Sequence, residues 1–526
     1  MLKKVYTKED RSRKIFHNNI RSRSGGTGRR PGLKIPCCES SVPVRSRSAA
    51  PKNSRKTQNL QSVHILFYVL LYNNGANYKL DGRAFSFYIY IFRKKRQETR
   101  DKSPKNKEGD ESVPLNKNTK TVNGVIYSSD GKKLIKYPKD KDWKSFTIPK
   151  GIKEIGDGAF ADCQSLKKVR MPESLISIGE QAFSNCASLS GIVFPSSLKK
   201  IARKAFAGCV SLTKITLPNS LCILEEMSFS RCTSLNSANL SSSLEYIGSY
   251  SFDGCISLKE VHIPRGVEGI GEGAFSHCSS LSTIEVPDSV TLVRENAFEH
   301  CASLTQVRLS NGVTAVSECT FYDCRLLEVV VLPDKLVTVG QMAFKDCASL
   351  QVINIPKTVT RICKAAFACC SSLMAVNLPE GLKVIERSAF SDCVALENLH
   401  LPPSIVEIGD YAFLNCNRIY AAALPSSISY FGAGMFQGCK SLKALYIPQT
   451  VTLIRCSVPN ASIIRGCPKG MSIFCEGPAV NEADKSWRFV ENFKTAKITY
   501  NVPMWWYNKF CRQKDGKNEK KFMKSK

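Results

Sequence analysis

The sequence lacks long apolar runs and the short motifs of common enzyme families. No stretch of about 18 or more apolar residues occurs, so no segment is predicted to span a membrane as a helix. The phosphate-binding pattern G-x-x-x-x-G-K-[ST], the nucleophile pattern G-x-S-x-G and the zinc pattern H-E-x-x-H are absent. The chain is therefore predicted not to be an enzyme and to need no cofactor.

Net charge is small over most of the chain, although the whole sequence carries +30. Residues 1–120 hold 28 Lys and Arg against 9 Asp and Glu, and residues 508–526 hold 8 against 2. The other 387 residues carry only +5. A nucleic-acid groove must neutralise phosphates along its length, so the near-neutral middle argues against nucleic acid as a partner. Binding through the basic ends alone is a minor alternative, which predicts salt-sensitive binding that is lost without residues 1–120.

Residues 1–117 form a basic leader without a repeat pattern. The stretch "SGGTGRRPGLKIPC" (Ser24–Cys37) resembles the conceptual translation of a transfer RNA gene, and no Met lies between Met1 and Met171. The leader is interpreted either as a disordered basic tail or as sequence foreign to the protein. Its apolar stretch Val63–Tyr72 has the length of a signal-peptide core but lies too far from Met1 for a secretory signal.

A repeat of 23 residues organises the chain from Phe160 to Phe436. Phe recurs thirteen times without a slip, and a Cys follows each Phe at the third place. Self-similarity at this period is typical of a solenoid, in which each coil contacts only its neighbours. We call the thirteen Cys the cysteine ladder: Cys163, Cys186, Cys209, Cys232, Cys255, Cys278, Cys301, Cys324, Cys347, Cys370, Cys393, Cys416 and Cys439.

The apolar places within one repeat predict a short strand followed by a second extended or turn segment. In the repeat of Phe206, Ile215 and Leu217 alternate with polar residues, which indicates a strand with one buried face. Pro218 then stops the strand. The spacing of Phe206, Cys209 and Leu212 suits a 3₁₀ or short α connection. Stacking such coils predicts a leucine-rich-repeat-like solenoid of short parallel strands, curved into an arc.

Repeats of the form "AFxxCxSLxxIxIPxxLxxIG" resemble the BspA-type leucine-rich repeats of bacterial and some protist surface proteins. The resemblance covers about Thr121 to Tyr507, and its ends resemble the lead-in and closing segments of that family. Trp143, Trp487, Trp505 and Trp506 are large enough to cover the open end coils. The expected organisation is a leader (1–117), an N-terminal cap (118–158), thirteen repeats (159–458), a C-terminal cap (459–507) and a basic tail (508–526).

Packing explains the cysteine ladder better than metal binding or disulfides do. A zinc site needs four converging ligands, and a straight file of thiols cannot supply them. An odd number of thiols cannot pair within itself, and parallel Cβ vectors suit the disulfide torsion poorly. We therefore predict buried free thiols that fill space between coils. Whether Cys456, Cys467 and Cys475 form one disulfide in an exported protein is left open.

The remaining candidates for chemistry are weak. His277 and His300 precede two ladder Cys in adjacent coils, so they could approach each other and bind a metal, but no third ligand converges with them in the sequence. The favoured interpretation is that each of the two imidazoles is hydrogen-bonded within the protein or exposed to solvent. No metal site is predicted.

The outward side of the strands varies while the interior does not, and this side is the predicted partner-binding face. Val329, Val331 and Val352 form its most apolar stretch. The predicted residues are Lys168, Arg170, Glu260, His262, Thr283, Glu285, Gln306, Arg308, Val329, Val331, Val352, Asn354, Asn398, His400 and Tyr446.

The resemblance implies a surface or secreted adhesin-like protein that recognises another protein, such as a host matrix or cell-surface protein. The variation of the outward side has a plainer explanation, tolerance of exposed positions to any residue. An intracellular scaffold or regulatory protein is the alternative function, because reduced thiols and the missing export signal suit the cytoplasm.

Overall fold

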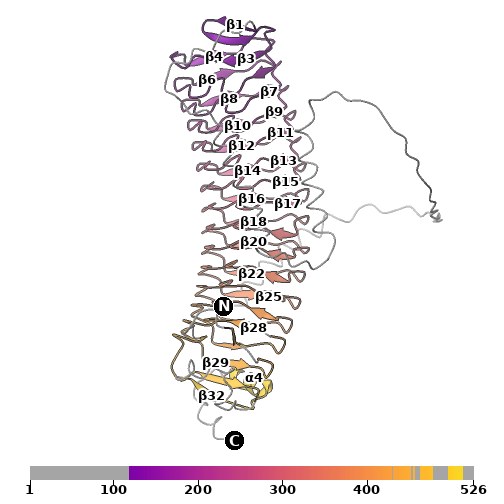
Figure 1. Ribbon diagram of the computed structural model, residues 1–526, viewed down its shortest axis with the longest axis vertical. Coiled ribbons are helices and arrows are strands. Elements are labelled where there is room, and N and C mark those ends of the chain that lie inside the picture. Colours follow the sequence, from indigo (N-terminus) through magenta and orange to yellow (C-terminus); the bar gives the residue numbers. More distant parts are fainter. Residues whose placement is uncertain (1–117, 429, 452–453, 456–462, 478–495, 513–526) are drawn as a thin grey trace, which may run out of the picture. The chain divides into compact units, whose positions relative to one another are not determined.

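A computed structural model describes most of the chain beyond the basic leader. Every described residue belongs to one unit, which lies within Ser112–Lys526. That unit is a parallel β-solenoid of about 15 turns whose coils stack in chain order, so the predicted solenoid is confirmed (Figure 1). The predicted leader lies outside the described residues. The described residues are 118–428, 430–451, 454–455, 463–477 and 496–512.

One wall of the coils, which we call the face wall, is a strand of three or four residues in nearly every coil. In the coil of Asn398 it is only an isolated bridge to Ala375. In Lys214–Thr216 the middle residue Ile215 is buried and its two neighbours are exposed, as alternation predicts. Most of these strands pair in parallel with the counterpart in a neighbouring repeat, for example Ile215 with Ala238, and the wall consists of several short sheets in succession. The strands are β4 (Ser145–Thr147), β6 (Lys168–Arg170), β8 (Gly191–Val193), β10 (Lys214–Thr216), β12 (Ser237–Asn239), β14 (Glu260–His262), β16 (Thr283–Glu285), β18 (Gln306–Arg308), β20 (Val329–Val331), β22 (Val352–Asn354), β24 (Ala375–Asn377), β27 (Ala421–Ala423), β29 (Ala444–Ile447), β31 (Ser472–Cys475) and β32 (Lys497–Thr499).

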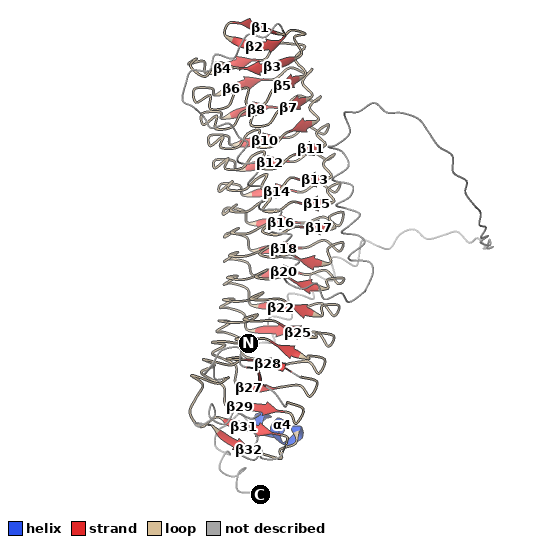
Figure 2. Ribbon diagram, viewed as in Figure 1, coloured by secondary structure: helices blue, strands red, loops and turns tan. Residues whose placement is uncertain are grey.

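The opposite wall, which we call the second wall, is a nearly continuous ladder of shorter strands (Figure 2). The pattern predicted only an extended or turn segment here, and the structure resolves it as strands of mostly two residues. Ile155 pairs with Ile178, and Ile178 with Ile201, so one aliphatic residue per coil stacks into the core. The strands are β3 (Lys133–Lys136), β5 (Glu154–Ile155), β7 (Ser177–Ile178), β9 (Lys200–Ile201), β11 (Ile223–Leu224), β13 (Tyr246–Ile247), β15 (Gly269–Ile270), β17 (Leu292–Val293), β19 (Ala315–Val316), β21 (Thr338–Val339), β23 (Arg361–Ile362), β25 (Val384–Ile385), β26 (Glu407–Ile408), β28 (Tyr430–Gly432) and β30 (Ile454–Arg455).

The connection around each Phe is a series of single turns. The Cys163 N–H donates to the Phe160 carbonyl at 3.2 Å, which is the i to i+3 bond of a 3₁₀ turn. The residues two before and two after each Phe have positive φ, as at Gln181 (53°) and Asn185 (57°), and this prevents a continuous 3₁₀ helix. The later of the two places is mostly Gly, Asn or Asp, the residues that enter the left-handed region at least cost.

The thirteen Phe rings form a single stack through the interior. All of them are fully buried, and successive ring centroids lie between 4.7 Å (Phe160 to Phe183) and 5.7 Å (Phe229 to Phe252) apart with nearly parallel planes. One coil could not bury its own ring, whereas each stacked ring is covered on both faces. The core is therefore continuous from coil to coil, and each coil needs the adjacent coils to shield its apolar interior from water.

The segments assigned to caps each contain a further coil. Tyr137 lies one full repeat before Phe160 and packs on its ring at 4.9 Å, and Trp143 stacks on Phe146. Upstream, the antiparallel hairpin of β1 (Thr119–Val122) and β2 (Val125–Ser128) pairs with β3 and closes the edge of the second wall.

At the C-terminal end, the Cys467 thiol donates to the carbonyl of Phe436 at 3.1 Å, so Cys467 continues the cysteine ladder. The segment between Cys439 and Cys467 is longer than one repeat, which hid this coil from the repeat count. Helix α4 (Met504–Arg512) then crosses the expected boundary between cap and tail. Trp487 lies outside the described residues, and Trp505 is exposed.

Two core serines give a stability prediction. Ser228 and Ser251 precede their Phe by one residue, where nine other coils have Ala, and both hydroxyls are buried without a hydrogen-bond partner among the described residues. A buried unpaired hydroxyl costs about 1–3 kcal/mol. Ser228→Ala and Ser251→Ala should each raise the free energy of unfolding by about 1 kcal/mol in urea titrations followed by circular dichroism.

Thr320 is the matched control for these serines. It occupies the same place in its coil and is equally buried, but its hydroxyl donates to the Ser317 carbonyl at 2.9 Å. Thr320→Ala should therefore lower the free energy of unfolding. Equal effects of all three substitutions would show that hydrogen bonding at this place does not control stability.

Candidate functional site

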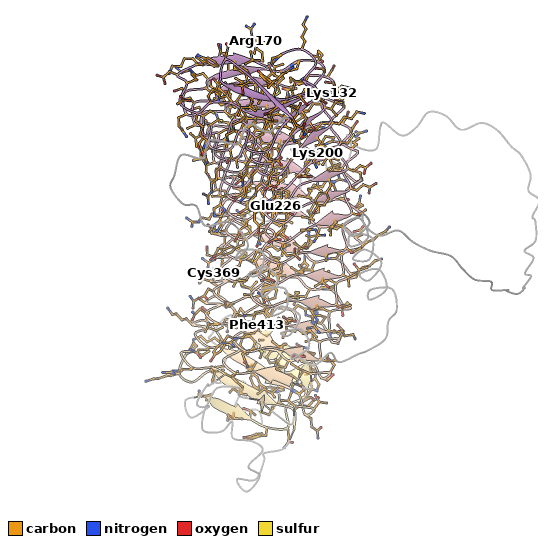
Figure 3. All side chains as sticks on the ribbon, turned by 45° about the horizontal axis from the view of Figure 1, so that its top comes forward. Lys132, Arg170, Lys200, Glu226, Cys369 and Phe413 are labelled. Carbon is orange, nitrogen blue, oxygen red and sulfur yellow. The ribbon has the colours of Figure 1, made fainter. Side chains whose placement is uncertain are left out.

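The solvent side of the face wall, which we call the strand face, carries the predicted partner-binding residues. Each strand contributes the two residues that flank its buried middle position. Figure 3 draws the side chains on the ribbon and labels Arg170 of β6 in the face wall and Lys200 of β9 in the second wall. All the predicted residues except Tyr446 are exposed.

Charge divides the strand face into two parts. The first coils carry Lys168, Arg170 and Lys214, and the charges end at Arg308, whose guanidinium lies 3.8 Å from the carboxylate of Glu285. From β20 to β27 the flanking positions contain no Lys, Arg, Asp or Glu. We call this part the uncharged face: Val329, Val331, Val352, Asn354, Ala375, Asn377, Asn398, His400, Ala421 and Ala423.

Three valines of the uncharged face are markedly exposed. Val329, Val331 and Val352 expose 52%, 50% and 46% of their surface. Next to them the Asn377 amide donates to the Asn354 side-chain oxygen, so that part of the polar capacity is satisfied within the face. Val193 in β8 is 81% exposed and was not among the predicted residues. Its position in the repeat is the same as that of Val331, so the register alone could have identified it.

Tyr446 was wrongly predicted to lie on the exposed face. It is 1% exposed because helix α4 covers the end of the strand face. Its ring lies 5.5 Å from that of Tyr507, and Phe474 of the next strand lies 5.2 Å from Trp506. These side chains form a small core separate from the main one. The repeat pattern could not reveal this cover, because α4 follows outside the repeats.

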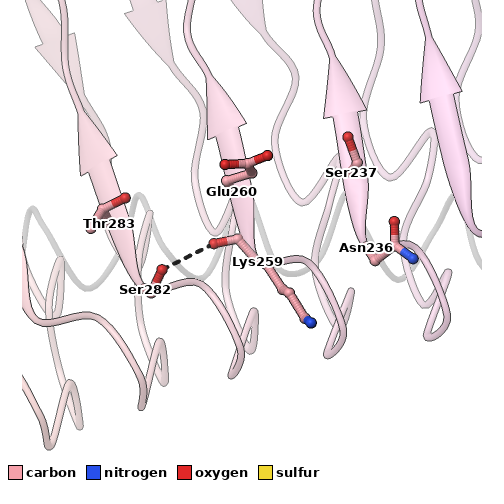
Figure 4. Close-up of a pocket in the computed structure, with 6 residues that line it drawn as sticks. All are labelled: Asn236, Ser237, Lys259, Glu260, Ser282 and Thr283. Atoms are coloured by element: carbon pink, nitrogen blue, oxygen red, sulfur yellow. Dashed lines mark hydrogen bonds between the residues drawn. The ribbon is translucent and has the colours of Figure 1, made fainter.

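A polar hollow lies on the strand face over β12, β14 and β16. It has a volume of about 430 Å³ and is lined by hydroxyl, amide and charged side chains. In Figure 4 Glu260 lies between Ser237 and Thr283, and the Ser282 hydroxyl donates to the Lys259 carbonyl at 3.4 Å. The lining residues are Asn236, Ser237, Lys259, Glu260, Ser282 and Thr283.

The cysteine ladder lies inside the coils and bonds to the backbone. Each thiol from Cys186 to Cys439 donates to the carbonyl of the Phe in the preceding coil, for example Cys209 to Phe183 at 3.2 Å. The thirteen thiols are free and buried. Burial raises the pKa of Cys209 to about 12, well above the ordinary 9.0. A protonated thiol is a donor and a weak nucleophile, so this environment suits packing.

The sequence does not determine whether the three C-terminal cysteines form a disulfide, and they occupy different positions. Cys467 and Cys475 are free, and Cys467 bonds to the backbone as a further member of the ladder. Burial raises the pKa of both thiols to about 11. Cys456 lies outside the described residues.

The histidine pair is close, and each ring has polar partners. The rings of His277 and His300 lie 4.5 Å apart, and His300 Nδ1 lies 2.9 Å from an Asp323 carboxylate oxygen. His277 Nδ1 lies 2.8 Å from the Ser276 hydroxyl. Over the described ranges, no group of three or more His, Cys, Asp or Glu side chains could hold a metal ion. This part of the chain therefore provides no ligand set for a metal.

Comparison with known families identifies the repeat. The pattern described as "BspA type Leucine rich repeat region (6 copies)" matches residues 137–255, 223–351 and 337–459. These matches together span more than half of the chain. A comparison with curated proteins found no match.

Solved structures with a similar fold come from several bacteria. A leucine-rich repeat protein from Bacteroides ovatus is 24% identical, with 73% of this chain and 90% of that chain covered and a TM-score of 0.48. A leucine rich cell surface protein from Faecalibacterium prausnitzii is 24% identical, with 65% and 95% covered and a TM-score of 0.45. The pneumococcal vaccine antigen PcpA is 19% identical, with 73% and 88% covered and a TM-score of 0.36.

Proposed function

The chain belongs to the family of BspA type leucine-rich repeat proteins, and on that premise we propose that it is a non-enzymatic protein that binds another protein through its strand face. Proteins built from these repeats are generally non-enzymatic, and such solenoids are consistent with a protein-binding scaffold. The observation that carries the proposal is the contrast between a constant interior and a varied, exposed strand face. A rigid wall that displays changing side chains suits recognition of an extended protein surface.

The proposed location is the cell surface or the extracellular medium, and the proposed role is adhesion to a host matrix or cell-surface protein. The family supports this location, because its bacterial members include surface proteins. Within the described ranges, no helix is both long and apolar enough to cross a membrane.

Site-specific photo-crosslinking tests the binding proposal. A photoreactive amino acid replaces Val331 on the strand face or Leu292 on the second wall, both of which are exposed apolar positions. The full chain is then irradiated in its native cells, and the covalent products are identified by mass spectrometry. We expect one protein to be captured from position 331 and not from position 292. Equal capture from both walls, or no capture from the strand face, would contradict the proposal.

An intracellular scaffold is the second candidate function, and one observation favours it. Cys222 is a free thiol exposed on the solvent, and the other described cysteines are also unpaired. Unpaired thiols persist more readily in reducing compartments. Protease treatment of intact cells separates the two locations: a surface protein loses its repeats to the protease, whereas an intracellular one keeps them until the cells are lysed.

A further inference from the structure

The strand face already holds an α-helix at its C-terminal end. Residues that point outward from β29, Ala444 and Tyr446, are buried there, although the same places are exposed in most earlier coils. Their cover is helix α4, which places Tyr507 against both Tyr446 and Phe474. The wall thus accepts a helix that buries Tyr507 and packs Met504 and Trp506 against it.

The seat of α4 continues without a break into the uncharged face. Ala421 and Ala423 of β27 pack against the α4 core and are themselves only half-buried, so they border the helix and also begin the open surface. Beyond them no Lys, Arg, Asp or Glu occupies the flanking positions until Arg308. Small side chains such as Ala375 leave room above the strands in the middle of the uncharged face, and the exposed valines lie at its far end. We propose that the uncharged face binds an amphipathic α-helix of a partner protein, next to α4.

The dimensions of the uncharged face fit such a helix. It extends over five coils, which at ~4.8 Å for each strand spacing gives about 24 Å. A helix rises 1.5 Å per residue, so about 16 residues, or four to five turns, would cover this length. The contacting side of that helix must be apolar, since charged groups would lose water there without finding an opposite charge.

Addition of an extended strand is disfavoured on this surface. β22 pairs with β24 and β27 with β29, whereas β20 and β22 belong to separate sheets and the coil of Asn398 forms only an isolated bridge with Ala375. The next coil of the stack still lies alongside each of these edges, so a partner strand could not pair there without separating two coils. Side-chain packing of the kind seen under α4 is the mode that remains, and apolar anchors at helical spacing are its signature.

Two synthetic peptides test this inference, which rests on the proposed function. Both have about 16 residues, the same composition and no net charge, but one places Leu at i, i+3, i+4 and i+7 while the other alternates Leu strictly. Their binding to the full chain is measured by fluorescence anisotropy. We expect the helical-period peptide to bind, and Val331→Lys combined with Val352→Lys to weaken its binding at least tenfold.

Val193→Lys is the matched control, because Val193 is exposed on the same strand face but lies outside the uncharged face. It should change the affinity less than twofold, and each variant must keep the parent urea midpoint. Equal binding of the alternating peptide, equal weakening by Val193→Lys, or no binding sensitive to Val331 would overturn the inference. If crosslinking still captures a protein from position 331 in that case, the proposed function stands and only the helical partner is wrong.

Discussion

The solenoid should lose most of its stability between pH 9 and pH 10.5. Burial raises the pKa of ten ladder thiols above the ordinary 9.0, to about 12 for Cys209. The unfolded chain therefore releases these protons first, and the stability they contribute is complete below pH 9 and is lost as the pH rises. Above pH 9 each thiol lowers the free energy of unfolding by about 1.4 kcal/mol per pH unit. Ten thiols therefore lower it by about 14 kcal/mol at pH 10.

Urea titrations of the full chain at several pH values measure this loss. Replacing two adjacent ladder members, Cys255→Ala and Cys278→Ala, should reduce the slope of the unfolding free energy above pH 9 by about 2.8 kcal/mol per pH unit, because two thiols no longer titrate. Cys222→Ser, at an exposed thiol, should leave the slope unchanged. A fall in the parent chain's unfolding free energy of only about 2 kcal/mol by pH 10, little more than one thiol accounts for, would contradict a buried, protonated ladder.

Removing one ring from the middle of the stack should be the most damaging single substitution. The ring of Phe298 is fully buried between those of Phe275 at 5.6 Å and Phe321 at 5.5 Å. Phe298→Ala deletes contacts with both neighbouring coils and leaves a cavity, at a cost of about 3–5 kcal/mol. Because coils contact only their neighbours, the cavity should also split urea unfolding into two separate transitions.

Phe298→Leu is the conservative control for this cavity, since it keeps an apolar side chain of similar reach. It should cost less than half as much and leave unfolding in a single transition. An exposed apolar residue of the second wall, Leu292, provides a surface control, and Leu292→Ala should change stability by less than about 1 kcal/mol. Equal losses for Phe298→Ala and Leu292→Ala would show that stacking between coils does not hold the solenoid together.

The repeat made most of the fold predictable. One Phe and one Cys at the same two places of every repeat fix the register, and alternation around Ile215 locates the face wall. The second wall was less visible because a strand of two residues is too short to show a period. The left-handed turn residues also had a signal, since Asp162 and Asn185 are residue types that tolerate positive φ.

The ends of the solenoid were harder to predict. The coil of Cys467 breaks the regular spacing, and Tyr137 replaces Phe in the first coil. A search for Phe and Cys at intervals of 23 residues therefore misses both coils. The exposure of Tyr446 was predicted wrongly because α4 covers it, and contact between segments far apart in sequence leaves no local pattern.

The central claim is that neighbouring coils seal an interior in which the ladder thiols are shielded from solvent and bonded to the backbone. Thiol labelling of the native full chain, resolved residue by residue by mass spectrometry, tests it most directly. The account predicts that the exposed Cys222 reacts at once, whereas Cys232 to Cys416 react only at the rate of unfolding. Labelling of these ladder thiols as fast as Cys222, in a chain that keeps its β-sheet circular dichroism, would contradict it.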